Sequence, residues 1–251
     1  MPAKVIPVTG LNLGPVGSVS QSDFPLRTPR QVKSTDTKSV AFGEPVVLNS
    51  DNTYSSVAQT LANAAGSISA ASALGIAVAN TRTNPTFPMA GSLGVVTPGG
   101  SYAPATIADV LTQGTVNIQV NNGTPTAGGA VFIRLVANAS IPAGIVGMLE
   151  AVADTVATTG TASSGSTALT VASGTGIAVG QLVTGAGIAA GTYVAAVSGT
   201  SVTLSANTTA ALSSTAVTFA NTVVVNCMKF KTGVLGSDGT AQVTIPTRVM
   251  V

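Results

Sequence analysis

Residues 115–136 read TVNIQVNNGTPTAGGAVFIRLV, which is two apolar stretches on either side of a turn-forming segment. Apolar and polar residues alternate in TVNIQV, so one face of a strand carries Val116, Ile118 and Val120. The residues NNG readily adopt positive φ angles and predict a turn. A second strand is predicted in GGAVFIRLV, where one face is made by Val131, Ile133 and Leu135.

Arg134 lies on the opposite face of this second strand, together with Phe132. A charged residue in this position has two interpretations. It is either a functional surface contact or an ordinary solvated charge.

Short β-branched stretches separated by Gly and Pro continue along the chain, which is typical of many short strands joined by turns. The stretch ALGIAVANT (73–81) predicts a buried strand. Two closing strands are predicted in TVVVNCMKFKTG (222–233) and AQVTIPTRVMV (241–251), with a turn at GSDG (236–239). The stretch SSVAQTLANAAG (55–66) predicts either one short helix that stops at Gly66 or a loop.

No Asp, Glu, Lys or Arg occurs between Asp154 and Lys229. Five short strands are predicted within this neutral segment: ALTVAS, GQLVTG, TYVAAVS, SVTLSA and STAVTF. Thr, Ser and Gly keep such a surface soluble without charge, because hydroxyls and exposed backbone form hydrogen bonds with water. We therefore expect an inserted β-module at 157–220 and a discontinuous first domain made of 1–156 and 221–251.

The predicted fold class is all-β, with a discontinuous barrel-like or sandwich-like body, the inserted module and an extended N-terminal arm at 1–47. Prolines recur in this arm, where they remove backbone donors and favour extended chain. Five of the ten basic residues lie there, namely Lys4, Arg27, Arg30, Lys33 and Lys38. They are opposed there by Asp23, Asp36 and Glu44.

The composition argues against several classes of protein. Charged residues make up 7% of the chain and hydrophobic residues 45%, with a net charge of +2, which is not the composition of a disordered chain. There is no His, and Cys227 is the single cysteine, so an intrachain disulfide is impossible and the commonest catalytic base and metal ligand are missing. We expect Cys227 to be a buried structural thiol.

No enzymatic activity, cofactor or metal is predicted. A hydrolase would need two facing carboxylates, such as Glu44 and Asp109, whereas solvated or turn carboxylates are the simpler interpretation of these residues. The basic residues Arg27, Arg30 and Lys33 could meet nucleic-acid phosphates, but they are few. An acidic protein surface is the favoured partner, and simple exposure to solvent is the alternative interpretation. A membrane role would need a basic amphipathic helix, which the sequence lacks.

Several segments, in their order and spacing, resemble the structural cement, or capsid decoration, proteins of tailed bacteriophages. They are FGEPVVL (42–48), LGIAVANTRT (74–83), YAPATIADVLTQGTVNIQVNNGTPTAGGAVFIRL (102–135) and KFKTGVLGSDGTAQVTIPTRV (229–249). The resemblance implies a β-rich protein on the outside of an icosahedral head that reinforces contacts among major capsid proteins. The neutral segment is similar to Gly/Thr/Ala-rich modules of phage structural proteins and of some bacterial surface proteins.

From this resemblance we expect the major capsid protein as partner, with self-association as a dimer or trimer on the capsid. The expected location is the outer capsid surface of the virion, after synthesis in the bacterial cytoplasm. The expected capsid-contact residues are Phe24, Arg27, Arg30 and Lys33, and the module is expected to project outward. The alternative is a tail-fibre protein or surface adhesin that binds host glycans through the module.

Overall fold

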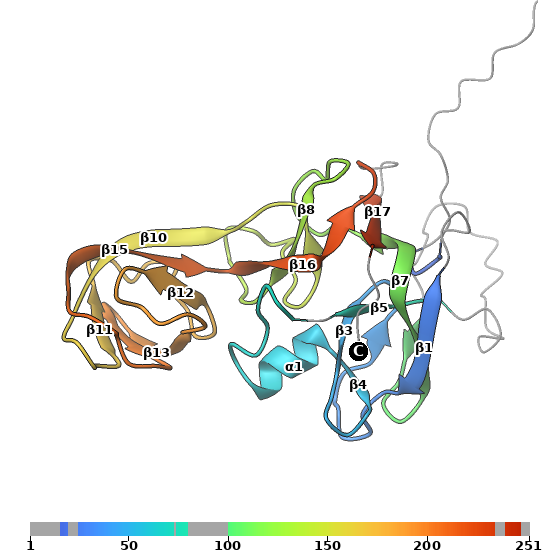
Figure 1. Ribbon diagram of the computed structural model, residues 1–251, viewed down its shortest axis with the longest axis horizontal. Helices are drawn as coiled ribbons and strands as arrows, with labels where there is room; N and C mark the ends of the chain where they lie inside the picture. Colours follow the sequence, from blue (N-terminus) through green and yellow to red (C-terminus); the bar gives the residue numbers. More distant parts are fainter. Residues whose placement is uncertain (1–15, 20–24, 73, 80–99, 234–238, 247–251) are drawn as a thin grey trace, which may run out of the picture.

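The computed structural model describes residues 16–19, 25–72, 74–79, 100–233 and 239–246. Apart from one short helix, the regular secondary structure of these residues consists of β-strands, so the predicted all-β fold class is confirmed (Figure 1). The larger part of the chain, here called the body, contains β1 (Leu26–Gln31), β2 (Val40–Ala41), β3 (Pro45–Leu48), β4 (Tyr54–Ser56), β5 (Gly75–Ala77), β6 (Ser101–Tyr102), β7 (Ile107–Gln119), β8 (Ala130–Arg134), β9 (Leu149–Glu150), β16 (Thr222–Phe230) and β17 (Thr240–Ile245). Its one helix among the described residues is α1 (Val57–Asn63).

Most of the body is a nine-stranded sheet in the order β4-β3-β5-β7-β17-β16-β8-β9, with β1 paired to β7. The first half of β7 lies between two strands, because Val110 and Leu111 pair with residues of both β1 and β5. From β5 the sheet continues through β3 to β4, where Tyr54 forms a parallel bridge with Val32, just after β1. The sheet thereby closes into a small barrel.

A bulge in β7 lets this strand serve two hydrophobic cores. Leu26 of β1 faces Gln113, but Arg27 faces Leu111, so Thr112 is an extra residue in β7. One extra residue reverses the alternation of side chains between the two faces of a sheet. The bulge therefore changes which positions of β7 point to each side.

The two cores lie on opposite faces of β7. Before the bulge, Val110 points into the small barrel, whose core also contains Val32, Val40, Val46, Tyr54, Ala77, Tyr102 and Ala108. Leu111 belongs to the larger core on the other face, and beyond the bulge Val116 and Ile118 point into that same core. The predicted apolar faces are confirmed, because this core contains Val116, Ile118, Val120, Val131, Ile133 and Leu135.

Gly114 marks the point where β7 changes partners. Residues 107–113 pair with β1, and residues 114–119 pair with β17. Gly114 has a φ of +119°, which disfavours L side chains, and a Cβ at this position would lie 3.1 Å from the backbone Cα of Pro25. The bend of β7 therefore requires glycine.

The stretch 55–66 contains a helix rather than only a loop. Ser56 is the N-cap of α1, and its hydroxyl accepts a hydrogen bond from the backbone N–H of Gln59 at 3.1 Å. Val57 and Leu61 point into the larger core and hold the helix against the sheet. Packing thus offsets the poor helix propensity of Thr, Ser and Asn.

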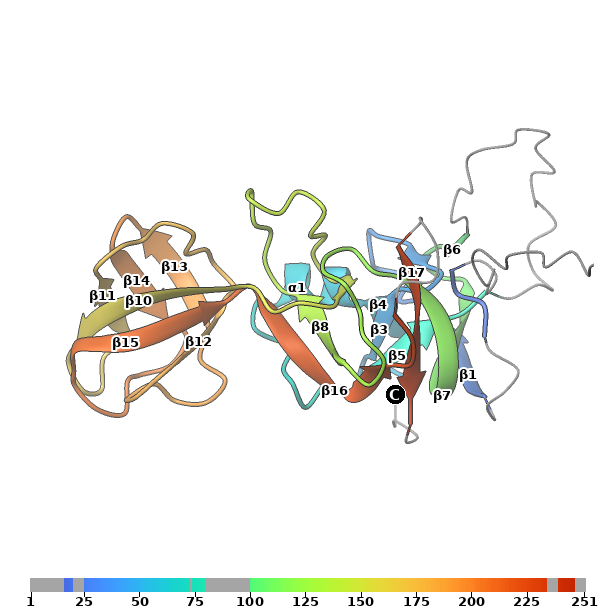
Figure 2. The ribbon, with the colours of Figure 1, turned by 90° about the horizontal axis from the view of Figure 1, so that it is seen from above.

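A six-stranded sheet lies at the other end of the molecule, as the two views agree (Figures 1 and 2). Its strands are β10 (Thr155–Ala162), β11 (Ala168–Val171), β12 (Leu182–Gly185), β13 (Val194–Ser198), β14 (Ser201–Leu204) and β15 (Leu212–Ala220), in the order β12-β15-β10-β11-β14-β13. A bridge between Leu182 and Tyr193 joins the two outer strands, so this sheet closes into a six-stranded barrel with its own core. Closure removes exposed strand edges.

The five strands expected in the neutral segment correspond to β11–β15, and β10 was not predicted. β10 is rich in Thr and Ala, so its pattern contains little apolar alternation. The division of the chain into a discontinuous domain and an inserted module at 157–220 stays a prediction. The structure adds that the segment enters and leaves the body at adjacent points, because Thr155 pairs directly with Ala220.

The described part of the predicted arm is built into the body. Residues 25–47 contain β1, β2 and most of β3, and Val32, Val40 and Val46 are completely buried. Residues 1–15 and 20–24 of the predicted arm lie outside the described residues. Within the described ranges, no helix is both long and apolar enough to cross a membrane.

Candidate functional site

Three of the four expected contact residues can be placed on the structure. Arg27 is exposed on β1, whereas Arg30 and Lys33 are half-buried and reach the turn between β3 and β4. A guanidinium N–H of Arg30 donates to the side-chain oxygen of Asn52, and the Lys33 ammonium lies 3.1 Å from the Asp51 carboxylate. Phe24 lies outside the described residues.

The turn that holds these two cations is itself hydrogen-bonded. The Thr53 hydroxyl donates to the Asp51 carboxylate at 2.6 Å, and this bond and the one from Lys33 lower the pKa of Asp51 to about 2. Lys33 and Arg30 therefore already have partners on the neighbouring hairpin. Of the three placed cations, Arg27 has no polar side-chain partner within the described ranges.

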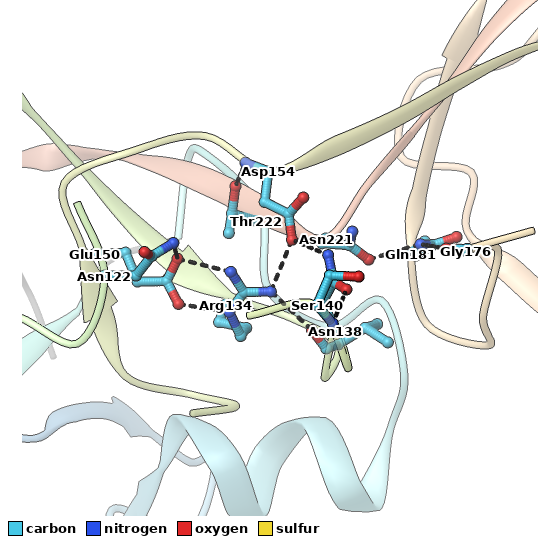
Figure 3. A network of polar contacts seen from close by, with 11 residues as sticks. Asn122, Arg134, Asn138, Ser140, Glu150, Asp154, Gly176, Gln181, Asn221 and Thr222 are labelled. Carbon is cyan, nitrogen blue, oxygen red and sulfur yellow. Dashed lines mark hydrogen bonds and ion pairs between the residues drawn. The ribbon is translucent and has the colours of Figure 1, made fainter. Parts of the chain in front are cut away.

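Both interpretations of Arg134 are wrong, because its side chain is completely buried. Its guanidinium forms a paired interaction with Glu150, with N–O distances of 2.5 Å and 2.9 Å (Figure 3). A third nitrogen lies 2.9 Å from the Asp154 carboxylate. Two carboxylates and a bidentate geometry compensate the desolvation of this cation.

The polar contacts continue from the body into the six-stranded barrel (Figure 3). The backbone N–H of Asn221 donates to the carbonyl of Asp154 at 2.9 Å, where the chain enters and leaves the barrel. The side-chain oxygen of Asn221 accepts a hydrogen bond from Gln181 at 2.6 Å, and Gln181 also donates to the carbonyl of Gly176. Gln181 and Asn221 are buried, so the joint is a closed polar network rather than a hydrated linker.

Apolar contacts surround this network. Leu182 of β12 packs against the larger core of the body. A Cβ on Gly66 would overlap the ring of Tyr193, and one on Gly180 would lie 3.4 Å from Val136. The barrel is therefore held against the body by side chains as well as by its two connecting strands.

The environment of Asp154 favours its charged form. Partial burial alone would raise the pKa of Asp154, but hydrogen bonds from Asn138, Arg134 and Asn221 outweigh it and lower the pKa. The Asn138 side chain donates at 3.0 Å, and the Asp154 carboxylate is only 12% exposed. The network thus favours an ionised Asp154 beside Arg134.

The scarcity of charged residues on either side of Arg134 in the sequence is a signal for this network. Residues 110–228 contain three charged side chains, and these are Arg134, Glu150 and Asp154. A single cation in so neutral a stretch has few possible counterions, and both available acids contact it. The roles of Gln181 and Asn221 have no comparable signal, because uncharged amides are common on surfaces.

The candidate carboxylates Glu44 and Asp109 and the thiol of Cys227 can also be placed on the structure. The buried Glu44 carboxylate accepts a hydrogen bond from the backbone N–H of Ala41 at 2.8 Å. Glu44 directly precedes β3 and Asp109 lies on β7, and β5 separates these two strands in the sheet. Cys227 is half-buried and its sulfur faces the carbonyls of Ser72 and Leu74, so its burial is less complete than expected. Within the described ranges, no cluster of three or more His, Cys, Asp or Glu side chains could bind a metal ion.

Comparison with protein families identifies the relatives of this chain. Residues 4–188 match the family described as XM1 gp53 minor capsid protein, which covers almost three quarters of the sequence. The chain belongs to this family. No curated protein sequence is matched.

Membership of the XM1 gp53 minor capsid protein family makes this chain a capsid-associated structural protein of a phage virion. The family match includes β1–β9 and the first three strands of the six-stranded barrel, and it ends between β12 and β13. β16 and β17 lie beyond the match but occupy the interior of the nine-stranded sheet. They complete the body that the matched residues begin.

Proposed function

We propose that this minor capsid protein binds the outside of the phage head and cements contacts among major capsid proteins. The observation that carries the proposal is the family match over residues 4–188. A protein that binds the assembled lattice and binds free subunits poorly adds its binding free energy to the stability of the lattice. Contacts with two or three neighbouring subunits would raise occupancy without strong single contacts.

The charge distribution supports a body that faces the lattice and a six-stranded barrel that projects outward. The barrel contains no charged side chain, whereas all the described charges lie on the body or at the joint. The network at the joint would fix the direction in which the barrel points. Self-association as a dimer or trimer on the lattice is part of the same proposal.

A binding role without catalysis fits the carboxylates of the body. Glu150 and Asp154 contact Arg134, and Glu44 accepts a backbone hydrogen bond, so each of these acids has a structural partner. The competing role of a tail-fibre adhesin for host glycans rests on the composition of the barrel alone.

Electron microscopy of virions labelled on this protein tests the assignment. We expect label over the outer surface of the head. Label confined to the tail would replace the proposal with the adhesin, and label absent from intact virions would contradict an outer location.

A further inference from the structure

Asn122 belongs to the polar network at the joint, and it is the only asparagine of the sequence that is followed by glycine. Its side-chain nitrogen donates to the Glu150 carboxylate at 3.3 Å, and Glu150 is the bidentate partner of Arg134 (Figure 3). Both side chains of that ion pair are completely buried. Asn122 thus supplies an uncharged donor to a carboxylate that has no access to solvent.

The backbone around Asn122 forms a strand-like contact with β9. The N–H of Asn121 donates to the carbonyl of Leu149 at 3.1 Å, and the carbonyl of Asn122 accepts a hydrogen bond from the N–H of Ala151 at 2.8 Å. These bonds join the edge strand β9 to the segment that follows β7. The position of Asn122 therefore matters both to the sheet and to the buried ion pair.

Gly123 combines exposure with a free backbone nitrogen. It is exposed, and no described residue accepts a hydrogen bond from its N–H. Its φ is +82°, and a Cβ at this position would lie 3.1 Å from the backbone nitrogen of Val152, so the turn requires glycine. Glycine also places no side chain beside the Asn122 amide. The fold therefore keeps an Asn-Gly dipeptide in contact with water.

We propose that Asn122 is a site of spontaneous deamidation, which introduces a carboxylate into the joint network. In this reaction the backbone nitrogen of Gly123 attacks the side-chain carbonyl carbon of Asn122. The C–N bond of the side-chain amide breaks, and its nitrogen leaves with the Gly123 proton as ammonia. Water then opens the resulting succinimide ring at either carbonyl, which gives aspartate or isoaspartate at position 122.

The product does not fit the surroundings of Asn122. A carboxylate at this position cannot donate to Glu150, and it adds a negative charge beside an acid that already shares one cation with Asp154. Like charges repel strongly where water is excluded. Isoaspartate also lengthens the backbone by one carbon atom, which displaces the bonds to Leu149 and Ala151. Deamidation therefore loosens the network that holds the barrel on the body.

The life of a virion gives this slow reaction time to proceed. The proteins of a particle are not renewed after assembly, so chemical changes accumulate in a capsid-associated chain. The joint of an old particle would then be weaker than that of a new one. This inference does not depend on where the chain binds the head.

Peptide mass spectrometry of the purified full chain, incubated in its folded state at neutral pH, measures the reaction. Asn122 should convert to aspartate and isoaspartate at least tenfold faster than Asn52 and Asn207, which are exposed but are followed by threonine. N122Q is the matched control, because glutamine must form a larger imide ring and reacts much more slowly. This variant should remove the main isoaspartate signal.

N122D tests the consequence, because it installs the aspartate product directly. It should lower the melting temperature by several degrees and speed hydrogen exchange at the N–H of Asn221, which donates to Asp154 at the joint. N207D adds the same charge to an exposed position of the barrel and should change both quantities little. Native chain that has aged during the incubation should behave like N122D.

The outcomes decide each part of the inference. If Asn122 converts only after the chain is unfolded in urea, the fold protects the dipeptide and the inference is overturned. If Asn122 converts in the folded chain but the melting temperature and the exchange at Asn221 stay unchanged, the network does not sense the reaction and the proposed consequence is wrong. Equal effects of N122D and N207D would contradict that consequence as well.

Discussion

Arg134 shows at the residue scale how this nearly neutral chain accommodates a buried charge. Its guanidinium contacts the carboxylates of Glu150 and Asp154. Asn138 donates a further hydrogen bond to Asp154, and Gln181 donates one to the side-chain oxygen of Asn221. Breaking such a pair leaves an uncompensated buried charge, which costs far more than the intact pair contributes. The network is therefore the most sensitive point of the joint.

Replacement of Arg134 by Ala is expected to lower the free energy of unfolding by roughly 3–5 kcal/mol, because Glu150 would remain buried without its cation. Chemical denaturation measures this change. R27A removes an exposed cation of the same type and should change stability by less than about 0.5 kcal/mol. Equal effects of the two substitutions would contradict the structural role of the network.

The shifted pKa values of Glu44 and Asp51 predict opposite effects of pH on the stability of the fold. Burial raises the pKa of Glu44, so the folded state loses stability as pH rises from the unfolded pKa through the folded one. E44Q should then be more stable than the native chain at pH 7, and the difference should vanish toward pH 4. The pKa of Asp51 is lowered to about 2, so D51N should instead lose stability at pH 7, with the loss disappearing as pH falls toward 2. Thermal melting across this pH range measures both, and a parallel response of the two variants would refute the assignment.

The six-stranded barrel is the element whose independence can be tested. Thr155 and Ala220 are paired neighbours, so residues 156–219 can be replaced by Asn-Gly, a two-residue hairpin turn. The two cores of the body involve the barrel only through Leu182, so the shortened chain should fold cooperatively and still bind heads. A chain that fails to fold would show that the barrel is part of the body, and a folded chain that no longer binds would place the barrel in the interface.

Sequence patterns predicted the strands better than they predicted which strands and side chains contact one another. Alternation in TVNIQV and AVFIRLV identified the core faces of β7 and β8 correctly, because this signal is local. The extra residue Thr112 and the bridge between Val32 and Tyr54 depend on partners distant in sequence, so no local pattern reveals them. The contacts of Arg134 were missed for the same reason, since Glu150 and Asp154 lie 16 and 20 residues further along the chain.

At the scale of the whole molecule, charge is distributed unevenly. The body presents exposed lysines and arginine, whereas the six-stranded barrel is neutral and closed, without strand edges that could recruit other chains. This arrangement suits a protein that attaches by one end and remains inert at the other. A truncation of residues 1–47 would remove β1, β2 and most of β3, so it would test folding rather than attachment.

The central claim is that this minor capsid protein stabilises the assembled head, and thermal disruption of heads with and without it measures that directly. Heads that lack the protein should release their DNA at a lower temperature than complete heads, and saturating purified protein should restore the higher value. Identical disruption temperatures with and without bound protein would contradict the account.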